Sequence, residues 1–231
     1  MGFDVVASKR CNCFLFSAYH LQMKIYRLFQ FLSISTTLFA LAATATAQTL
    51  VRYESQPGSK MRLEGTSSIH DWHAESQLVG GYVELEGALI ESPDKLKPGK
   101  VAAKAETFVA VRSLKCSSGK LMDAVMQEAI KEKENPRITF RLTELSLKEV
   151  KGAQVGLEAK GSLSVAGVTK DITFPLTLHR RVDTSRANFT GTAALKMTDF
   201  GIKPPAPTAG AGLIKTGDEV KLIFEWAVAK K

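Results

Sequence analysis

The sequence predicts an all-β domain, an antiparallel arrangement of about eight strands with one helical insertion. Three observations predict it. Apolar and polar residues alternate through stretch after stretch, which is the period of a strand with one buried face. Turn signals such as Pro-Gly and Gly-Asp separate these stretches. One segment, residues 118–133, carries its apolar residues at helical spacing instead.

The first part of the chain has the layout of a secretory signal peptide. Lys24 and Arg27 precede an apolar stretch over residues 28–43, and Ala45-Thr46-Ala47 offers the small residues that a signal peptidase reads. The stretch is shorter than the roughly 20 residues of a membrane span, and an uncleaved anchor is the alternative. We expect residues 1–47 to be a targeting segment that starts at Met23 and is cleaved after Ala47, which leaves a mature domain over residues 48–231.

Charge and cysteine content change on that cleavage. Four basic residues and one acidic residue leave, so the net charge falls from +8 to +5, and Cys116 is the one cysteine that remains. Basic residues are interleaved with acidic ones, which is typical of a solvated surface. The sequence therefore predicts no nucleic-acid partner and at most weak contact with an anionic membrane surface.

The strand stretches follow one another with no repeat and no linker. In chain order, they begin at Met61, then cover one or two strands within residues 72–85, and then residues 101–111, 138–142, 155–165, 172–178, 189–197 and 220–228, with a kink expected at Gly161. Eight strands closed into a barrel can be filled by side chains or can hold one small ligand. Small inward residues such as Ala105 and Ala159 leave room inside, but they also suit a solid sandwich or barrel core.

The helical segment has an apolar face that must cover something. Its apolar positions are Leu121, Met122, Val125, Met126, Ala129 and Ile130, and Asn135-Pro136 ends it. We expect this helix either to plug one end of the fold or to act as a lid over it.

The candidate ligand-binding wall is the set of inward apolar residues on the alternating strands. Its members are Ile138, Phe140, Leu142, Leu157, Leu163, Phe174, Leu176, Leu178, Leu195, Met197, Leu222 and Phe224. Each of these residues also suits a plain hydrophobic core.

A catalytic site has weaker support. His70, Asp71 and His73 are close in sequence, but residues at an odd separation on a strand point to opposite faces, so a shared metal requires the segment to turn. The chain has no G-x-S-x-G elbow, phosphate loop, dinucleotide fingerprint or zinc-ligand spacing. We therefore expect no enzymatic activity, no metal and no cofactor.

Several motifs in a fixed order complete the sequence pattern. Residues 65–72 read G-T-S-S-I-H-D-W, residues 135–140 N-P-R-I-T-F, residues 161–170 G-S-L-S-V-A-G-V-T-K, residues 198–202 T-D-F-G-I and residues 217–220 G-D-E-V. Together they resemble the YceI-like family, the lipocalin-like polyisoprenoid-binding proteins of the bacterial periplasm. Two positions depart from the family pattern, with Asn135 in place of a Tyr and Met197 in place of an Arg.

The resemblance implies a periplasmic, eight-stranded, lipocalin-like barrel. It also implies an apolar or amphiphilic, isoprenoid-like lipid as the ligand, bound for carriage or storage. An envelope protein with a solid core that serves a structural or partner-binding role is the alternative, followed by a metal-dependent enzyme that uses His70, Asp71 and His73. The sequence leaves the oligomeric state open, a dimer included.

Overall fold

The structure is a computed structural model that describes residues 49–181, 183–206 and 214–231. The expected signal peptide over residues 1–47, with its start at Met23 and its cleavage site after Ala47, lies outside the described residues. Within the part that is described, no helix has both the length and the apolar content needed to cross a membrane.

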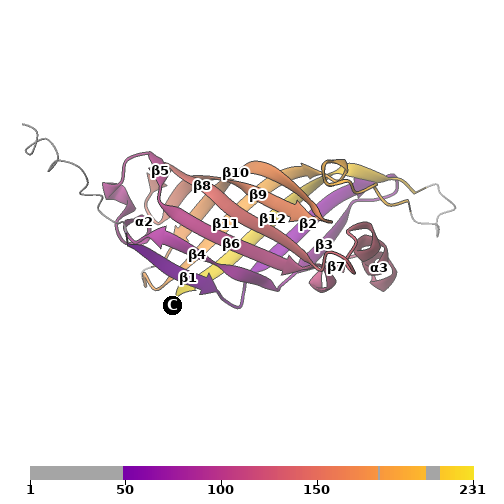
Figure 1. Cartoon of the computed structure of the whole chain (residues 1–231), viewed down its shortest axis with the longest axis horizontal. Helices are drawn as coiled ribbons and strands as arrows, with labels where there is room; N and C mark the ends of the chain where they lie inside the picture. Colours follow the sequence, from indigo (N-terminus) through magenta and orange to yellow (C-terminus); the bar gives the residue numbers. More distant parts are fainter. Residues whose placement is uncertain (1–48, 182, 207–213) are drawn as a thin grey trace, which may run out of the picture. The chain divides into compact units, whose positions relative to one another are not determined.

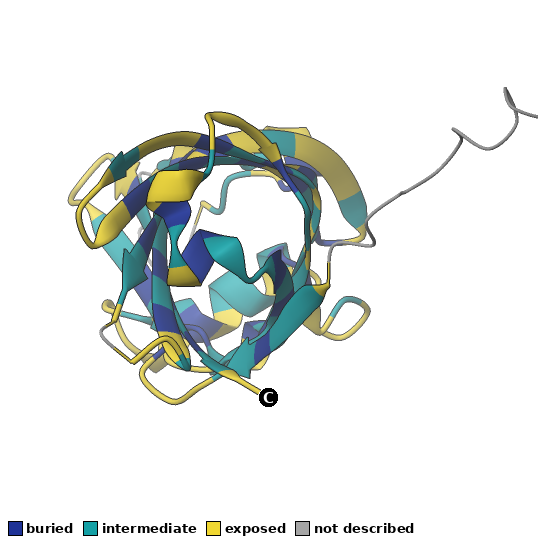
Figure 2. Cartoon of the chain, turned by 90° about the vertical axis from the view of Figure 1, so that its left-hand side faces the viewer, coloured by how far each residue is buried: buried dark blue, intermediate teal, exposed yellow. Residues whose placement is uncertain are grey.

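Eight strands close into an antiparallel barrel, as the alternation predicted. The ring consists of β1 (Leu50–Ser55), β4 (Val79–Glu86), β6 (Ala103–Ala110), β8 (Arg137–Lys151), β9 (Gln154–Val165), β10 (Val168–Arg180), β11 (Arg186–Lys196) and β12 (Thr216–Lys230), in this spatial order. Pairing of β1 with β12 closes it, for example between Tyr53 and Lys230. Figure 1 shows the strands from the side, and Figure 2 shows the closed ring along the barrel axis.

Three strands of the ring are extended at one end by a second segment. Strand β2 (Lys60–Ser67) follows β1 along the edge of β12, β3 (Trp72–Ser76) precedes β4, and β7 (Lys115–Cys116) follows β6 after a 3-10 turn, η2 (Val111–Ser113). The three added segments pair with one another in the order β2, β3 and β7, so that β7 is the edge strand. Helix α3 (Lys120–Ala129) comes next in the chain and lies beside β7 (Figure 1).

Helix α3 is shorter than the segment predicted for it, because turns take over from Ile130 onward. Lys131 has a φ of 58°, a left-handed conformation that interrupts an α-helix. The alternation of the strands did not predict the short helix α2 (Ala88–Glu91) or the 3-10 turns η1 (Pro93–Lys95) and η3 (Thr198–Phe200).

The kink expected at Gly161 stays a prediction, and β9 runs unbroken through this residue from Gln154 to Val165. The irregularity lies on the partner strand, where the register of β8 shifts between Leu142 and Glu144 directly opposite. The turn predicted at Ala166-Gly167 is present, since Val165 pairs with Val168 and the two turn residues have φ values of 52° and 83°. Positive φ at both central residues is the requirement of a type I′ hairpin.

The end of the barrel beside α2 is solidly packed. Leu89 and Ile90 of α2 have no exposed surface, and Leu178 opposite them is equally buried. Arg180 fixes this short helix, because its Nε donates to the carbonyl oxygen of Ile90 at 2.7 Å and its Nη2 to that of Glu91 at 3.2 Å. Strand β5 (Gly99–Val101) pairs with β8 at this same end.

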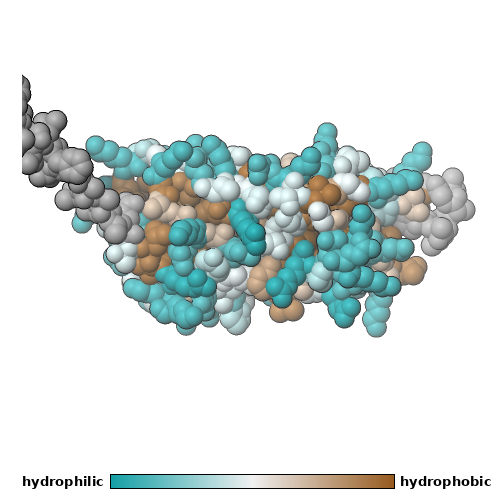
Figure 3. All heavy atoms as spheres, viewed as in Figure 1, coloured by the Kyte–Doolittle hydropathy of each residue, from teal (hydrophilic) through white to brown (hydrophobic). Residues whose placement is uncertain are grey.

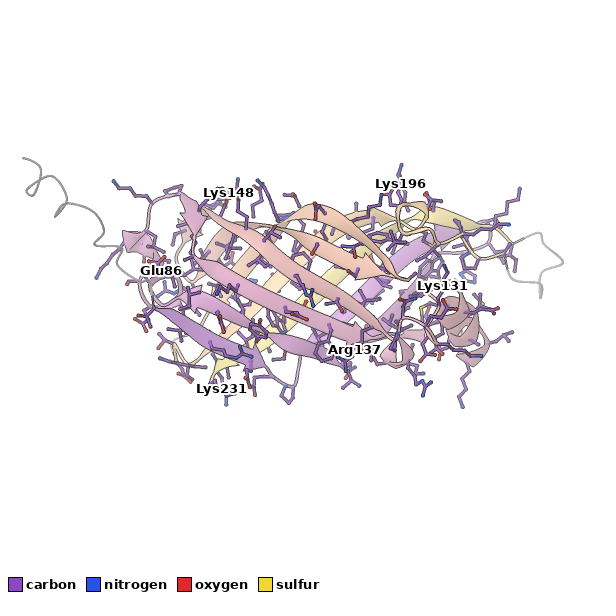
Figure 4. The ribbon with its side chains drawn as sticks, viewed as in Figure 1. Glu86, Lys131, Arg137, Lys148, Lys196 and Lys231 are labelled. Carbon is purple, nitrogen blue, oxygen red and sulfur yellow. The ribbon has the colours of Figure 1, made fainter. Side chains whose placement is uncertain are left out.

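Charged side chains lie on the outside of the barrel. Hydrophilic residues are spread along the face shown in Figure 3, with apolar patches between them. Lys148 and Lys196 point away from the barrel in Figure 4, and the Nζ of Lys148 lies 3.0 Å from a carboxylate oxygen of Glu158. The strands thus separate a charged outer surface from an apolar interior.

Candidate functional site

The interior is hollow at the α3 end. A cavity of about 260 Å³, called the outer chamber here, lies between α3, the β2–β3 hairpin and the barrel wall. Its lining residues are Leu63, Ser67, Ile69, His70, Trp72, Cys116, Ser118, Met122, Val125, Met126, Ala129, Ile130, Ile138, Leu163, Val165, Leu195, Lys196, Met197, Phe200, Ile202, Pro205, Ile214, Thr216, Val220 and Leu222. None of them is a carboxylate, and most are apolar, so the chamber suits an uncharged chain.

Helix α3 forms one side of the outer chamber with its apolar face. Met122, Val125 and Met126 line the chamber, while Asp123 is turned the other way into a buried contact with β7. The carboxylate of Asp123 accepts the backbone N–H of Cys116 at 2.6 Å and lies 3.4 Å from the Nζ of Lys115. The helix therefore covers the chamber and is held in place by one buried acidic residue.

The β2–β3 hairpin forms the opposite rim of the outer chamber. The hydroxyl of Ser67 donates to the carbonyl oxygen of His70 at 2.7 Å and accepts its backbone N–H at 3.2 Å. The indole Nε1 of Trp72 donates to the carbonyl oxygen of Thr66 at 3.1 Å. These hydrogen bonds shape a hairpin that presents His70 and the half-buried Trp72 to the chamber.

Asp218 anchors the third segment at this end, the turn η3. It accepts the backbone N–H of Thr198 at 2.9 Å and the Thr198 hydroxyl at 2.7 Å. These hydrogen bonds favour the ionised carboxylate and hold the pKa of Asp218 below its ordinary value. The turn in this way places Phe200 and Ile202, which are buried, against the chamber.

A second cavity lies deeper in the barrel. This inner chamber has a volume of about 110 Å³. Its lining residues are Met61, Val79, Val83, Leu85, Ala105, Thr107, Phe108, Val109, Ile138, Phe140, Leu142, Leu145, Ala159, Leu163, Ile172, Phe174, Leu176, Phe189, Leu222, Phe224 and Trp226. Ile138, Leu163 and Leu222 line both chambers, so the two cavities abut at these three side chains.

The structure brings most of the predicted wall together around these chambers. Leu195 and Met197 line the outer chamber; Phe140, Leu142, Phe174, Leu176 and Phe224 line the inner one; Ile138, Leu163 and Leu222 line both. Leu157 and Leu178 line neither chamber, and both are buried in the core cluster that also contains Leu89 and Ile90 of α2. Contact of any of these residues with a ligand stays a prediction.

Sequence reasoning missed most of the lining that β3, β4 and β6 contribute. Trp72 lines the outer chamber and Val83 and Phe108 line the inner one, and none of them belongs to the predicted wall. Ala105, which the sequence predicted to be a small inward residue, lines the inner chamber. The alternation in this region is interrupted by glycines and by the breaks between β3 and β4 and between β6 and β7. The motif over residues 65–72 was the available signal, because it forms the hairpin at the rim.

The residues of the catalytic alternative do not all meet. His70 lines the outer chamber, and its Nδ1 lies 2.9 Å from the backbone oxygen of Asp71, whereas Asp71 and His73 both line a groove on the outer surface. Within the described ranges, no three His, Cys, Asp or Glu residues are grouped so that they could hold a metal ion.

A closed antiparallel barrel with an apolar chamber under a helix defines a lipocalin-like class of barrel. The sequence narrows this class further, because the model of the YceI-like domain matches residues 57–228. The chain belongs to the YceI-like family.

Two solved structures have the same fold. BcnA of Burkholderia cenocepacia has a TM-score of 0.55 and 17% sequence identity, over 73% of this chain and 95% of that one. A polyisoprenoid binding domain from Saccharophagus degradans, implicated in plant cell wall breakdown, has a TM-score of 0.59 and 12% identity, over 79% of this chain and 99% of that one.

A curated relative has a higher sequence identity over a shorter length. The UPF0312 protein of Pseudomonas aeruginosa is 31% identical over 137 residues, which are 55% of this chain and 65% of the relative. The match thus spans somewhat less than two thirds of that protein.

Proposed function

We propose that this protein binds an apolar or amphiphilic lipid, isoprenoid-like in character, inside its barrel and carries or stores it unchanged. The outer chamber is the observation that carries the proposal, because its volume of about 260 Å³ is walled mostly by apolar side chains and by no carboxylate. Removing an apolar chain from water gains about 0.8 kcal/mol per CH₂, so a fitting apolar cavity is enough for binding.

The comparisons support the class of ligand. The Saccharophagus degradans domain is described as polyisoprenoid binding, and this chain has its fold. Met197 stands where the family pattern has an Arg, and it lines the outer chamber, so this chain offers a thioether there instead of a guanidinium. We place the polar end of the ligand beside Ser67, His70 and Ser118, which are the polar side chains on the hairpin and α3 side of the chamber.

The proposed location is the periplasm. The basic residues, the short apolar stretch and the Ala-Thr-Ala site within residues 1–47 support export, with cleavage after Ala47. Contact with an anionic membrane surface, the absence of a nucleic-acid partner and the oligomeric state stay predictions.

Native mass spectrometry of the protein purified from its own host tests the proposal. We expect a lipid to be retained at one copy per chain. An empty protein would contradict the proposal and favour an envelope protein with a structural role. A metal ion at one per chain would favour the enzyme alternative that uses His70, Asp71 and His73.

Two substitutions test whether the chambers are the site. Leu176→Arg and Phe224→Arg each place a charge in the inner chamber, and we expect them to abolish lipid binding. Thr173→Arg is the matched control, because Thr173 is an exposed residue of the same strand as Leu176. Retention of lipid by a folded Leu176→Arg or Phe224→Arg variant would show that the lipid binds elsewhere.

A further inference from the structure

A band of aromatic and glycine residues crosses the interior between the outer chamber and the packed end. This aromatic belt consists of Phe140, Gly161, Phe174, Gly191 and Phe224, one from each of the neighbouring strands β8 to β12. We propose that the belt walls the inner chamber so that it holds a single slender apolar chain, and that it thereby sets the chain length of the ligand. This inference rests on the proposed function and specifies it further.

The three rings of the belt contact one another in a row. The ring centroids of Phe140 and Phe174 are 5.4 Å apart, and those of Phe174 and Phe224 are 5.7 Å apart. Both pairs meet edge to face, at 64° and 89°, which is a favourable geometry for aromatic rings. The rings therefore support each other and form a continuous surface over half of the barrel's strands.

The two glycines let the outer rings lie flat against the wall. A Cβ atom on Gly161 would come within 2.5 Å of the Phe140 ring, and one on Gly191 within 2.7 Å of the Phe224 ring. Both distances are too short for two carbon atoms, so any other residue would force the rings to move. Neither glycine has a positive φ. On Gly161 a Cβ atom would also come within 2.3 Å of the backbone oxygen of Arg141, so close approach of β8 and packing of the rings together account for glycine at these positions.

Small residues continue the lining beside the belt. Ala105 and Thr107 lie on β6, the strand paired with β8, and line the inner chamber together with the belt rings. Two residues further along β10 from the chamber-lining Leu176, Leu178 is fully buried in the packed end. A chain that passes the junction at Ile138, Leu163 and Leu222 therefore enters a space of about 110 Å³ walled by the belt, and beyond it meets a closed wall. That space has room for the end of one chain.

A chain-length series tests the inference. The probes are the straight-chain fatty acids from octanoate to stearate, each measured by displacement of a fluorescent apolar dye. Ala105→Leu fills the inner chamber from β6, the strand next to the belt, and Gly191→Ala narrows it by pushing the Phe224 ring inward. Ala194→Leu is the matched control, because Ala194 is exposed and faces away from the interior.

We expect affinity for the wild-type protein to rise about four-fold per CH₂ until the chain fills the inner chamber. In Ala105→Leu the affinity should stop rising at a shorter chain length than in the wild type. Octanoate should then bind to this variant as it binds to the wild type, and stearate at least about ten-fold more weakly than to the wild type. Ala194→Leu should follow the wild-type curve. Because Ala105→Leu adds atoms to an existing void, it keeps the test valid if Gly191→Ala does not fold.

Two results would overturn the inference. One is an equal loss of affinity at every chain length, and the other is a curve for Ala105→Leu that matches the wild type. Failure of the wild-type protein to bind any of the acids would instead refute the proposed function, and the inference with it. A thermal melt of each variant shows whether it is folded.

Discussion

Leu176 and Leu178 lie on the same face of β10, two residues apart, and replacing each by alanine should have opposite consequences. Leu178 has no exposed surface and belongs to the packed cluster at the α2 end. A Leu→Ala change in such a core costs about 2–5 kcal/mol, and dense packing on all sides places Leu178 in the upper half of this range. At roughly 2–4 °C per kcal/mol for a domain of this size, the Tm should fall by about 12 °C.

Leu176 lines the inner chamber, so its removal enlarges a space that already exists. We expect a stability cost of about 2 kcal/mol, at the lower end of the same range. The ligand, however, loses apolar contact. About 40 Å² of lost contact at roughly 25 cal/mol per Å² is about 1 kcal/mol, or roughly a five-fold weaker Kd.

The assay is a thermal melt of each variant without ligand, followed by displacement of a fluorescent apolar dye by palmitate. Leu178→Ala should show the larger loss of Tm and a palmitate affinity close to that of the wild type. Leu176→Ala should show the smaller loss of Tm and the weaker palmitate binding. If Leu178→Ala weakens palmitate binding as much as Leu176→Ala while it leaves the Tm nearly unchanged, then the α2 end is not a packed core and our assignment of the two regions is wrong.

Three further predictions concern the α3 end and the N-terminus. Asp123→Ala removes the acceptor of the Cys116 N–H, so amide hydrogen exchange in α3 should speed up about ten-fold or more, and Asp123→Asn, which keeps an acceptor, should have the smaller effect. Hydrogen bonds from Thr198 hold the pKa of Asp218 below its ordinary value. The stability that ionised Asp218 contributes is therefore complete when the pH is above the ordinary pKa, and it is lost as the pH falls through the lower pKa of the folded state. The Tm difference between wild type and Asp218→Asn should therefore narrow in acid, and a constant difference would contradict this. N-terminal sequencing of the exported protein should begin at Gln48.

The alternation of β8 to β12 was strong enough to predict these strands and their inward faces. Each is long, and its apolar residues fall on one side with few interruptions, as in Ile172, Phe174 and Leu176. The same reasoning was less complete for β1 to β7. There the ring strands are divided into shorter segments at residues 56–59, 77–78 and 111–114, and glycines such as Gly81 replace apolar residues at inward positions.

The candidate site was only partly accessible to sequence reasoning. The inward face of β10 was visible as a stripe, but the pattern of Leu176 and Leu178 is identical, and one lines a chamber while the other is packed. The hairpin at residues 67–72 was visible as a motif, but its role as the rim opposite α3 depends on a contact between distant segments.

By itself the sequence determined the strand class, the position of the helix and the family, because periodicity and motifs are properties of neighbouring residues along the chain. The tertiary structure alone decided where the barrel is hollow. Ile90 and Arg180, which are far apart in sequence, meet at 2.7 Å and hold α2 in one end of the barrel. At the other end α3 covers a space that it does not fill. Whether an inward residue meets another side chain or a cavity depends on what the rest of the chain brings opposite to it, and no local pattern records that.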